Sequence, residues 1–119
     1  MLKPVLRAVE ESGRTVDDPT EEALHDLLAG MSLSHRFVIL DRLDLAPVGQ
    51  HYFQVYLNDD LSHQVEYRAG SADKHYEAHV PRLHEAFGPE ALTAKLMMDW
   101  AHDRRGWREA LPWAPLDLR

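Results

Sequence analysis

Two segments with alternating side chains, residues 63–68 and 74–80, constrain the fold more than any other feature of this sequence. The apolar residues of the two segments are Val65, Tyr67, Tyr76, Ala78 and Val80, and the polar ones are Gln64, Glu66, Arg68, His75, Glu77 and His79. Successive side chains of a β-strand point to opposite faces, so this pattern predicts a sheet with one covered face and one hydrophilic face. The short turn at residues 70–73 favours antiparallel pairing of the two strands.

Two further strands are predicted earlier in the chain. Residues 36–41 are β-branched and apolar on both faces, which is typical of a buried central strand. Residues 51–57 alternate imperfectly and end at the turn-forming run 58–60. The segment 45–50 between them contains proline and glycine, which indicates a connection.

The N-terminal segment, residues 4–16, has two interpretations. An extended stretch or loose hairpin would turn at Gly13, whereas a helix would begin at Pro4 and end at Gly13 with Val5, Leu6 and Val9 on one side. The residues alone leave both open.

The first helix is predicted over residues 19–30. Asp18 is a suitable N-cap, Pro19 suits the first helical position, and Gly30 favours an end there. The apolar stripe consists of Leu24, Leu27, Leu28 and Met31. Its spacing predicts a short amphipathic helix that buries one side.

The last helix is predicted over residues 89–105. Leu92, Leu96 and Trp100 stack at a spacing of four, and Gly106 is the expected terminator. A short helix after Pro81 would place Leu83 and Phe87 on one side, and the proline-rich tail 111–116 is expected to lie extended against the body.

The faces of these elements predict an α+β fold in a single domain over residues 1–119. An antiparallel sheet of about four to five strands would have two main helices packed on one face, because that arrangement buries both helix stripes against the apolar side of the sheet. The chain length lies in the usual range for one domain.

Composition excludes several classes of partner. The formal charge of −7 argues against nucleic acid, and no apolar run approaches the ~20 residues of a membrane span. The absence of cysteine excludes disulfides and thiolate metal sites and fits a cytoplasmic location. The N-terminus lacks the apolar core of a signal peptide, so no export is expected.

Histidine provides a possible metal site. His75, Glu77 and His79 share one strand face, and His63 or His51 could add a third ligand. Imidazoles two residues apart lie ~7 Å from each other along a strand, and no ligand-spacing signature is present. We therefore expect solvated sheet residues and no metal or other cofactor, with a metal- or small-ligand-binding domain using His75 and His79 as the alternative.

A catalytic serine has little support. Ser34 or Ser62 could pair with His35 or His63, but no nucleophile-elbow motif is present and adjacent residues of a strand point apart. No glycine-rich phosphate loop occurs either. The sequence thus predicts a protein that is not an enzyme.

Three tryptophans surround the end of the last predicted helix. Trp100, Trp107 and Trp113 are interpreted as a small satellite core, because aromatic side chains bury large areas. The alternative is a partner-binding hot spot in which an exposed tryptophan acts with neighbouring arginines.

A series of short motifs resembles a known family. The motifs are Asp18-Pro19-Thr20-Glu21-Glu22-Ala23-Leu24, Phe37-Val38-Ile39-Leu40, Tyr52-Phe53-Gln54-Val55, Val65-Glu66-Tyr67-Arg68, His75-Tyr76-Glu77-Ala78, Gly106-Trp107-Arg108 and Trp113. Over residues 17 to 114 they are similar to small actinobacterial proteins that resemble the Imm1-type immunity proteins of polymorphic toxin systems. The resemblance implies a small, acidic, non-enzymatic α+β protein that binds and blocks a toxin, with no catalytic residues.

The leading hypothesis is therefore an interaction protein of immunity type that binds a more basic protein. The predicted partner-binding residues are Gln54, Asp59, Asp60, Gln64, Glu66, Arg68, His75 and Glu77. Opposite potentials would speed encounter with such a partner. A homodimer that buries the polar sheet face is a further alternative.

Overall fold

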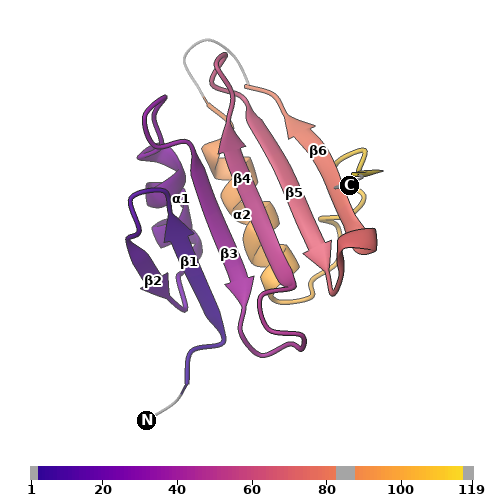
Figure 1. Ribbon diagram of the computed structural model, residues 1–119. Helices are drawn as coiled ribbons and strands as arrows, with labels where there is room; N and C mark the ends of the chain where they lie inside the picture. Colours follow the sequence, from indigo (N-terminus) through magenta and orange to yellow (C-terminus); the bar gives the residue numbers. More distant parts are fainter. Residues whose placement is uncertain (1–2, 83–87, 117–119) are drawn as a thin grey trace.

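Seven antiparallel strands form one sheet in the order β2-β1-β3-β4-β5-β6-β7 (Figure 1). The computed structural model describes residues 3–82 and 88–116. The elements are β1 (Leu6–Glu10), β2 (Thr15–Asp17), α1 (Glu21–Ala29), β3 (Phe37–Arg42), β4 (His51–Leu57), β5 (His63–Ala69), the 3₁₀ turn η1 (Ala72–Lys74), β6 (His75–Val80), α2 (Glu90–Ala101) and β7 (Ala114–Pro115). The predicted α+β class is confirmed.

The sheet has seven strands where four to five were expected. Residues 4–16 form the hairpin of β1 and β2, so the helical alternative for this segment is wrong. Gly13 makes the turn possible, since its φ of 96° lies in the region that glycine adopts without strain. At the other edge, the tail pairs with β6 as the two-residue strand β7, which agrees with its predicted extended course.

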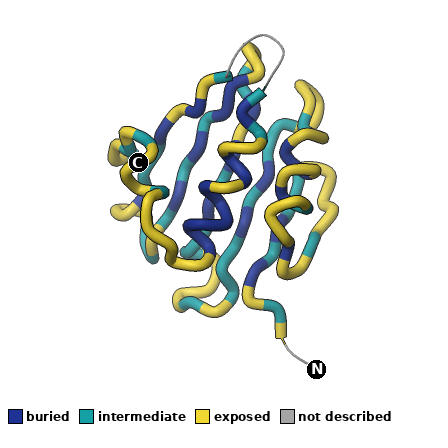
Figure 2. The backbone as a smooth tube through the Cα atoms, turned by 180° about the vertical axis from the view of Figure 1, so that it is seen from behind, coloured by how far each residue is buried: buried dark blue, intermediate teal, exposed yellow. Residues whose placement is uncertain are grey.

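Both helices cover the same face of the sheet, as predicted (Figures 1 and 2). Leu24, Leu27 and Leu28 of α1 and Leu96 and Met97 of α2 are buried in the core. The sheet contributes buried side chains from five strands, namely Leu6, Ala8, Val38, Leu40, Phe53, Val55, Leu57, Val65, Tyr67, Ala78 and Val80. This face is the apolar side that the alternation predicts.

The start of α1 differs from the expected one. Thr20 is the N-cap, and its hydroxyl accepts a hydrogen bond from the Ala23 amide at 3.1 Å. Asp18 instead turns the chain with a φ of 46°, and its carboxylate accepts hydrogen bonds from the amides of Val5 and Leu6, each at 2.9 Å. The aspartate therefore ties the first strand to the helix entrance.

Replacing Asp18 should weaken this tie. We expect Asp18→Ala to lower the free energy of unfolding by about 2 kcal/mol, because two amides lose a charged acceptor and alanine tolerates a positive φ poorly. Asp18→Asn keeps an acceptor oxygen and a residue type that adopts this conformation, so it should cost less than half as much. Urea denaturation of the three proteins measures both effects, and equal losses would contradict this role.

The helix α2 ends earlier than predicted, at Ala101. The left-handed residue after it is Asp103, with a φ of 54°, whereas Gly106 adopts its positive φ in a later turn. The Arg104 amide bonds to the Asp99 carbonyl at 2.8 Å and closes the helix end. The short helix predicted after Pro81 falls partly on residues 83–87, which lie outside the described residues.

The three tryptophans form the predicted satellite core. Trp100 is buried, and its ring lies 5.8 Å from that of Phe53. Trp113 contacts the same phenylalanine at 5.8 Å and Trp107 at 5.9 Å. These contacts attach the C-terminal tail to the sheet and to the end of α2.

Candidate interaction surface on the open sheet face

The face of the sheet opposite the helices carries the predicted binding residues. Strand register places Gln54, Glu66 and Glu77 side by side in one row across β4, β5 and β6. A second row runs from Asp41 through Tyr52 and Arg68 to His75, and a third runs from Phe37 through Tyr56 and Gln64 to His79. Asp59 and Asp60 lie in the turn between β4 and β5, beside the third row. We call these three rows, with Ile39 of β3 and with Arg7, Val9 and Asp17 from the hairpin, the open face.

Glu66 and Glu77 are directly paired across two strands, where like charges repel. Each glutamate has a separate hydrogen-bond partner. His75 Nε2 lies 2.7 Å from a Glu66 oxygen, and the Gln64 amide donates to Glu77 at 3.0 Å. The two carboxylates therefore stay fixed on the face.

His75 is far more buried than the alternation suggests, with 2% of its surface exposed. Arg68 donates from Nε to His75 Nδ1 at 3.1 Å, so Nδ1 must be the acceptor and Nε2 carries the proton shared with Glu66. The Tyr52 ring packs edge-on against His75 at 5.8 Å, and the Arg68 guanidinium lies over Tyr52 at 5.4 Å. The ring is thus a structural link within the face.

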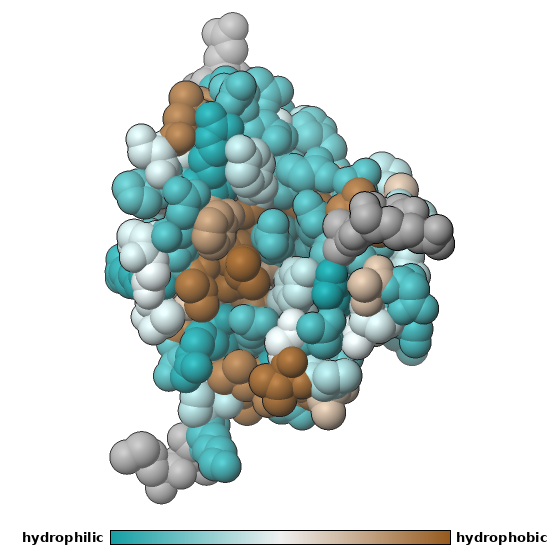
Figure 3. Space-filling model, viewed as in Figure 1, coloured by the Kyte–Doolittle hydropathy of each residue, from teal (hydrophilic) through white to brown (hydrophobic). Residues whose placement is uncertain are grey.

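An apolar strip was missed by the sequence analysis. Val9, Phe37 and Ile39 point to the open face and are only half-buried, and Figure 3 shows the corresponding hydrophobic patch over β1 and β3. The prediction that residues 36–41 are buried on both faces is wrong, because no described element covers the outer side of β3. The sequence did contain a feature that indicates this strip, because both sides of this strand are apolar.

Asp41 lies beside this strip, between Arg7 and Tyr52 in the register. Partial burial raises the pKa of the Asp41 carboxyl, and the nearby Arg7 charge acts in the opposite direction. A half-buried carboxylate next to apolar side chains is a favourable position for a cation from outside.

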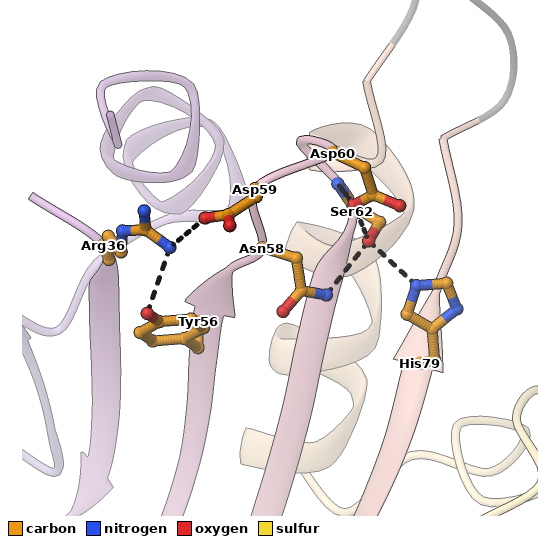
Figure 4. Close-up of a pocket in the computed structure, with 7 residues that line it drawn as sticks. All are labelled: Arg36, Tyr56, Asn58, Asp59, Asp60, Ser62 and His79. Carbon is orange, nitrogen blue, oxygen red and sulfur yellow. Dashed lines mark hydrogen bonds and ion pairs between the residues drawn. The ribbon is translucent and has the colours of Figure 1, made fainter. Parts of the chain in front are cut away.

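A hollow of about 470 Å³ opens at the end of β4, β5 and β6 (Figure 4). Its lining residues are Arg36, Tyr56, Asn58, Asp59, Asp60, Ser62 and His79. The Arg36 guanidinium bridges Asp59 at 2.8 Å and the Tyr56 hydroxyl at 3.1 Å. Leu61, in the turn between β4 and β5, has a φ of 68°, a conformation that costs energy for leucine.

Ser62, at the base of the hollow, meets both an acid and a histidine, yet the geometry opposes catalysis. Its hydroxyl lies within hydrogen-bond distance of Asp60, the Asn58 amide at 3.0 Å and His79 Nε2 at 2.9 Å. A hydroxyl donates one proton and accepts two, so it donates to Asp60 while Asn58 and His79 both donate to it. His79 therefore cannot act as the base that a nucleophilic serine needs, and Ser62 is itself buried.

Hydrogen bonds and an ion pair within the hollow determine the charges that it carries. The Ser62 hydroxyl and amide both hold the pKa of Asp60 below its usual value. Asp59 holds the Arg36 guanidinium in its charged form and raises its pKa. The hollow presents two carboxylates and one guanidinium to solvent.

The metal alternative gains no support from the geometry. His75 is bonded to Glu66 and Arg68, while His79 is bonded to Ser62, so the two rings belong to separate networks. The other suggested ligands lie elsewhere, because His63 is in the core and His51 bonds to the Ala46 carbonyl at 3.0 Å. Across residues 3–82 and 88–116, no three histidine or acidic side chains come close enough to hold a metal ion.

Neither helix in the described ranges is long and apolar enough to span a membrane. Comparison of the chain with known protein families, curated proteins and solved structures finds no match to any of them. The open face and its hollow are therefore the observations on which a function must rest.

Proposed function

We propose that this chain is a non-enzymatic interaction protein of immunity type, which binds and blocks a basic protein through the open face. The observation that carries the proposal is the apolar strip of Val9, Phe37 and Ile39, uncovered by other described residues and bordered by fixed tyrosines and carboxylates. A specific protein interface has the same anatomy, with an apolar centre and a polar rim.

The charge of the face selects the partner. It carries three arginines, Arg7, Arg36 and Arg68, and six carboxylates, Asp17, Asp41, Asp59, Asp60, Glu66 and Glu77, if the turn after β4 is included. Three positive and six negative charges leave a formal balance of −3. A basic partner surface would be steered toward this face.

The hydrogen-bond networks supply rigidity. Arg68 bonds to the Gln50 side chain at 2.9 Å as well as to His75, and Arg36 fixes the hydroxyl of Tyr56. Side chains that are already held in place lose little conformational entropy on binding. Tyr56 and Ile39 are therefore the expected anchors, with Glu77 in the rim.

The same charges disfavour the homodimer alternative. Two copies that bury the open face against each other would bring two surfaces of net negative charge together, and like charges across an interface cost free energy. We expect a monomer in light scattering across a dilution series. A dimer that dissociates in Ile39→Asp would instead assign the face to self-association.

Two substitutions on the face should strongly weaken partner binding. Ile39→Asp places a charge in the apolar strip and Glu77→Lys reverses a rim charge, and each should weaken affinity at least about 30-fold, equivalent to about 2 kcal/mol. The matched control is Leu92→Asp, because Leu92 is 37% exposed on α2, on the opposite side of the molecule.

The experiment captures partners from the native host and co-expresses the neighbouring reading frame with each variant. We expect the wild type and Leu92→Asp to capture one basic protein and to protect the host from its toxicity. Both face variants should neither capture this protein nor protect the host. Recovery of the same protein by all four baits would remove the face from the proposal. If no partner is captured and no bait protects the host, the immunity function is ruled out.

A further inference from the structure

The hollow at the end of β4, β5 and β6 is continuous with the open face (Figure 4). Tyr56 lines the hollow and also belongs to the third row of the open face, where the register pairs it with Phe37 of the apolar strip. The volume of about 470 Å³ leaves room for one long side chain. A partner that covers the apolar strip therefore brings its own side chains to the mouth of the hollow.

Several hydrogen-bond donors of the hollow are used within it. The Asn58 amide donates to the Ser62 hydroxyl oxygen at 3.0 Å, and His79 Nε2 donates to the same oxygen at 2.9 Å. The Ser62 hydroxyl in turn donates to Asp60. These groups are held by one another and wait for no further acceptor.

Acceptor oxygens of the turn are left over. Arg36 Nη1 bonds to Oδ1 of Asp59 at 2.8 Å, and the amide and hydroxyl of Ser62 both donate to Oδ1 of Asp60. Among the described residues, no donor reaches the second oxygen of either carboxylate or the side-chain oxygen of Asn58. A ligand of the hollow should therefore be a hydrogen-bond donor.

The charge of the hollow indicates that this donor is a cation. Arg36 neutralises Asp59, whereas no lysine or arginine in the described part of the chain forms an ion pair with Asp60. Two carboxylates and one guanidinium leave a formal charge of −1, with His79 neutral. Hydrogen bonds from a charged donor to a carboxylate are about twice as strong as those between neutral groups.

An ammonium group matches these acceptors better than a guanidinium. The planar guanidinium fork binds best to two free oxygens of one carboxylate, and here Asp59 and Asp60 each already use one oxygen. The Tyr56 ring also has a guanidinium beside it, since that of Arg36 lies 5.6 Å from the ring centre. An ammonium carries three separate donors, which suit single oxygens from different residues.

We propose that the hollow receives one lysine side chain of the partner protein, an inference that rests on the proposed function. The ammonium would bind Asp60 and the free oxygen of Asp59, and the stem would lie along Tyr56. A protein surface is the source rather than a free amine, because the Asp59 side chain is 85% exposed and sites for small free ligands enclose most of the ligand. An apolar neighbour of the lysine would then reach Phe37.

Two acetylated amino-acid amides test the hollow without the partner. Nα-acetyl-lysinamide supplies an ammonium on its natural stem, and Nα-acetyl-argininamide supplies a guanidinium of the same charge. In an NMR titration of the full chain, we expect the lysine probe to shift the side-chain resonances of Asn58 and His79 with a dissociation constant at least about threefold lower than that of the arginine probe. Equal affinity for the two probes, or no shift with the lysine probe, would overturn the proposal.

Asp60→Asn and Asp73→Asn form a matched pair of variants. Asparagine at position 60 keeps an acceptor oxygen for Ser62 and removes the charge, so the hollow should keep its shape. Asp73 also accepts a hydrogen bond from a serine two residues away, Ser71, and lies in the turn between β5 and β6, outside the hollow. We expect Asp60→Asn to weaken binding of the lysine probe at least about fivefold and Asp73→Asn to leave it unchanged. Equal losses would indicate general charge attraction and would overturn the site.

Capture of the partner separates this inference from the proposed function. We expect Asp60→Asn to lower the affinity for the captured basic protein about tenfold and Asp73→Asn to leave it unchanged. If both variants bind the partner equally well while Ile39→Asp does not, the open face stands and the lysine in the hollow is ruled out. If the wild type captures no partner but binds the lysine probe, the proposed function is ruled out and the hollow is a site for free amines.

Discussion

Phe53→Ala should lower the free energy of unfolding by about 4 kcal/mol, within the range of roughly 3–5 kcal/mol for removal of a buried phenylalanine. The side chain is fully buried on β4 and lies 5.8 Å from both Trp100 and Trp113, measured between ring centres. It therefore joins the sheet, the last helix and the tail. Truncation leaves a cavity that these large rigid rings cannot fill, which keeps the cost above the lower end of the range.

The matched control is the adjacent residue on the same strand. Gln54 points to the open face and no described hydrogen bond depends on its side chain, so Gln54→Ala should change stability by less than about 0.5 kcal/mol. Urea denaturation followed by tryptophan fluorescence measures both variants. A loss below about 2 kcal/mol for Phe53→Ala would show that the tail and α2 pack independently of the sheet.

Alternation in β5 and β6 was sufficient to predict which residues share a face. It placed Glu66, Arg68 and Glu77 together on the open side, because a period of two leaves only one way to bury Val65 and Tyr67. The same rule failed for β3, whose apolar outer side is not covered by any described element. A strand that is apolar on both sides has no periodicity to distinguish a buried face from an interface.

The partners within the site could not be predicted from the sequence. The link between Arg68 and His75 depends on the register of β5 with β6, and that of Ser62 with His79 joins residues 17 positions apart. Register is set by the whole sheet and its turns, whereas sequence spacing reports only one strand at a time. The histidines were visible as candidates, but their tautomers and bonds required the structure.

One end of each helix was missed because contacts that are distant in sequence decide it. Asp18 and Thr20 are both good N-cap residues two positions apart, and the choice depends on Asp18 bonding to the amide of Leu6, which is distant in sequence. At the end of α2, Asp103 takes the left-handed conformation because its carboxylate reaches Arg42 of β3 at 2.7 Å. In both cases a contact with the sheet decides between local alternatives of similar energy.

The stability of the protein should fall as the pH drops from 7 to 5, by about 2 kcal/mol, because of one buried histidine. His63 is fully buried between β5 and α2, where Nδ1 lies 2.8 Å from the Thr93 hydroxyl and Nε2 has no hydrogen-bond partner among the described residues. Burial lowers the pKa of His63 from 6.5 to about 4, because the charged ring would lose its hydration. The unfolded chain thus binds a proton more readily than the folded chain between these two values.

The sign and the window follow from this difference. Stability from neutral His63 is complete above pH 6.5 and is lost progressively as the pH falls toward 4, with a total of about 3 kcal/mol. Carboxylates with lowered pKa values, such as Asp60 and Asp99, lose their contribution only below their usual pKa of 3.8. Measurements between pH 7 and pH 5 therefore exclude the contribution of these carboxylates.

His63→Leu should flatten this dependence, because the replacement is apolar, close in size to the ring and unable to bind a proton. His25→Gln is the control, since His25 is exposed on α1 and its loss should leave the slope unchanged. Urea denaturation at half-unit steps of pH gives the slope for each protein. A slope that persists in His63→Leu would mean that another group titrates in this window and that His63 already finds a partner for its proton in the folded state.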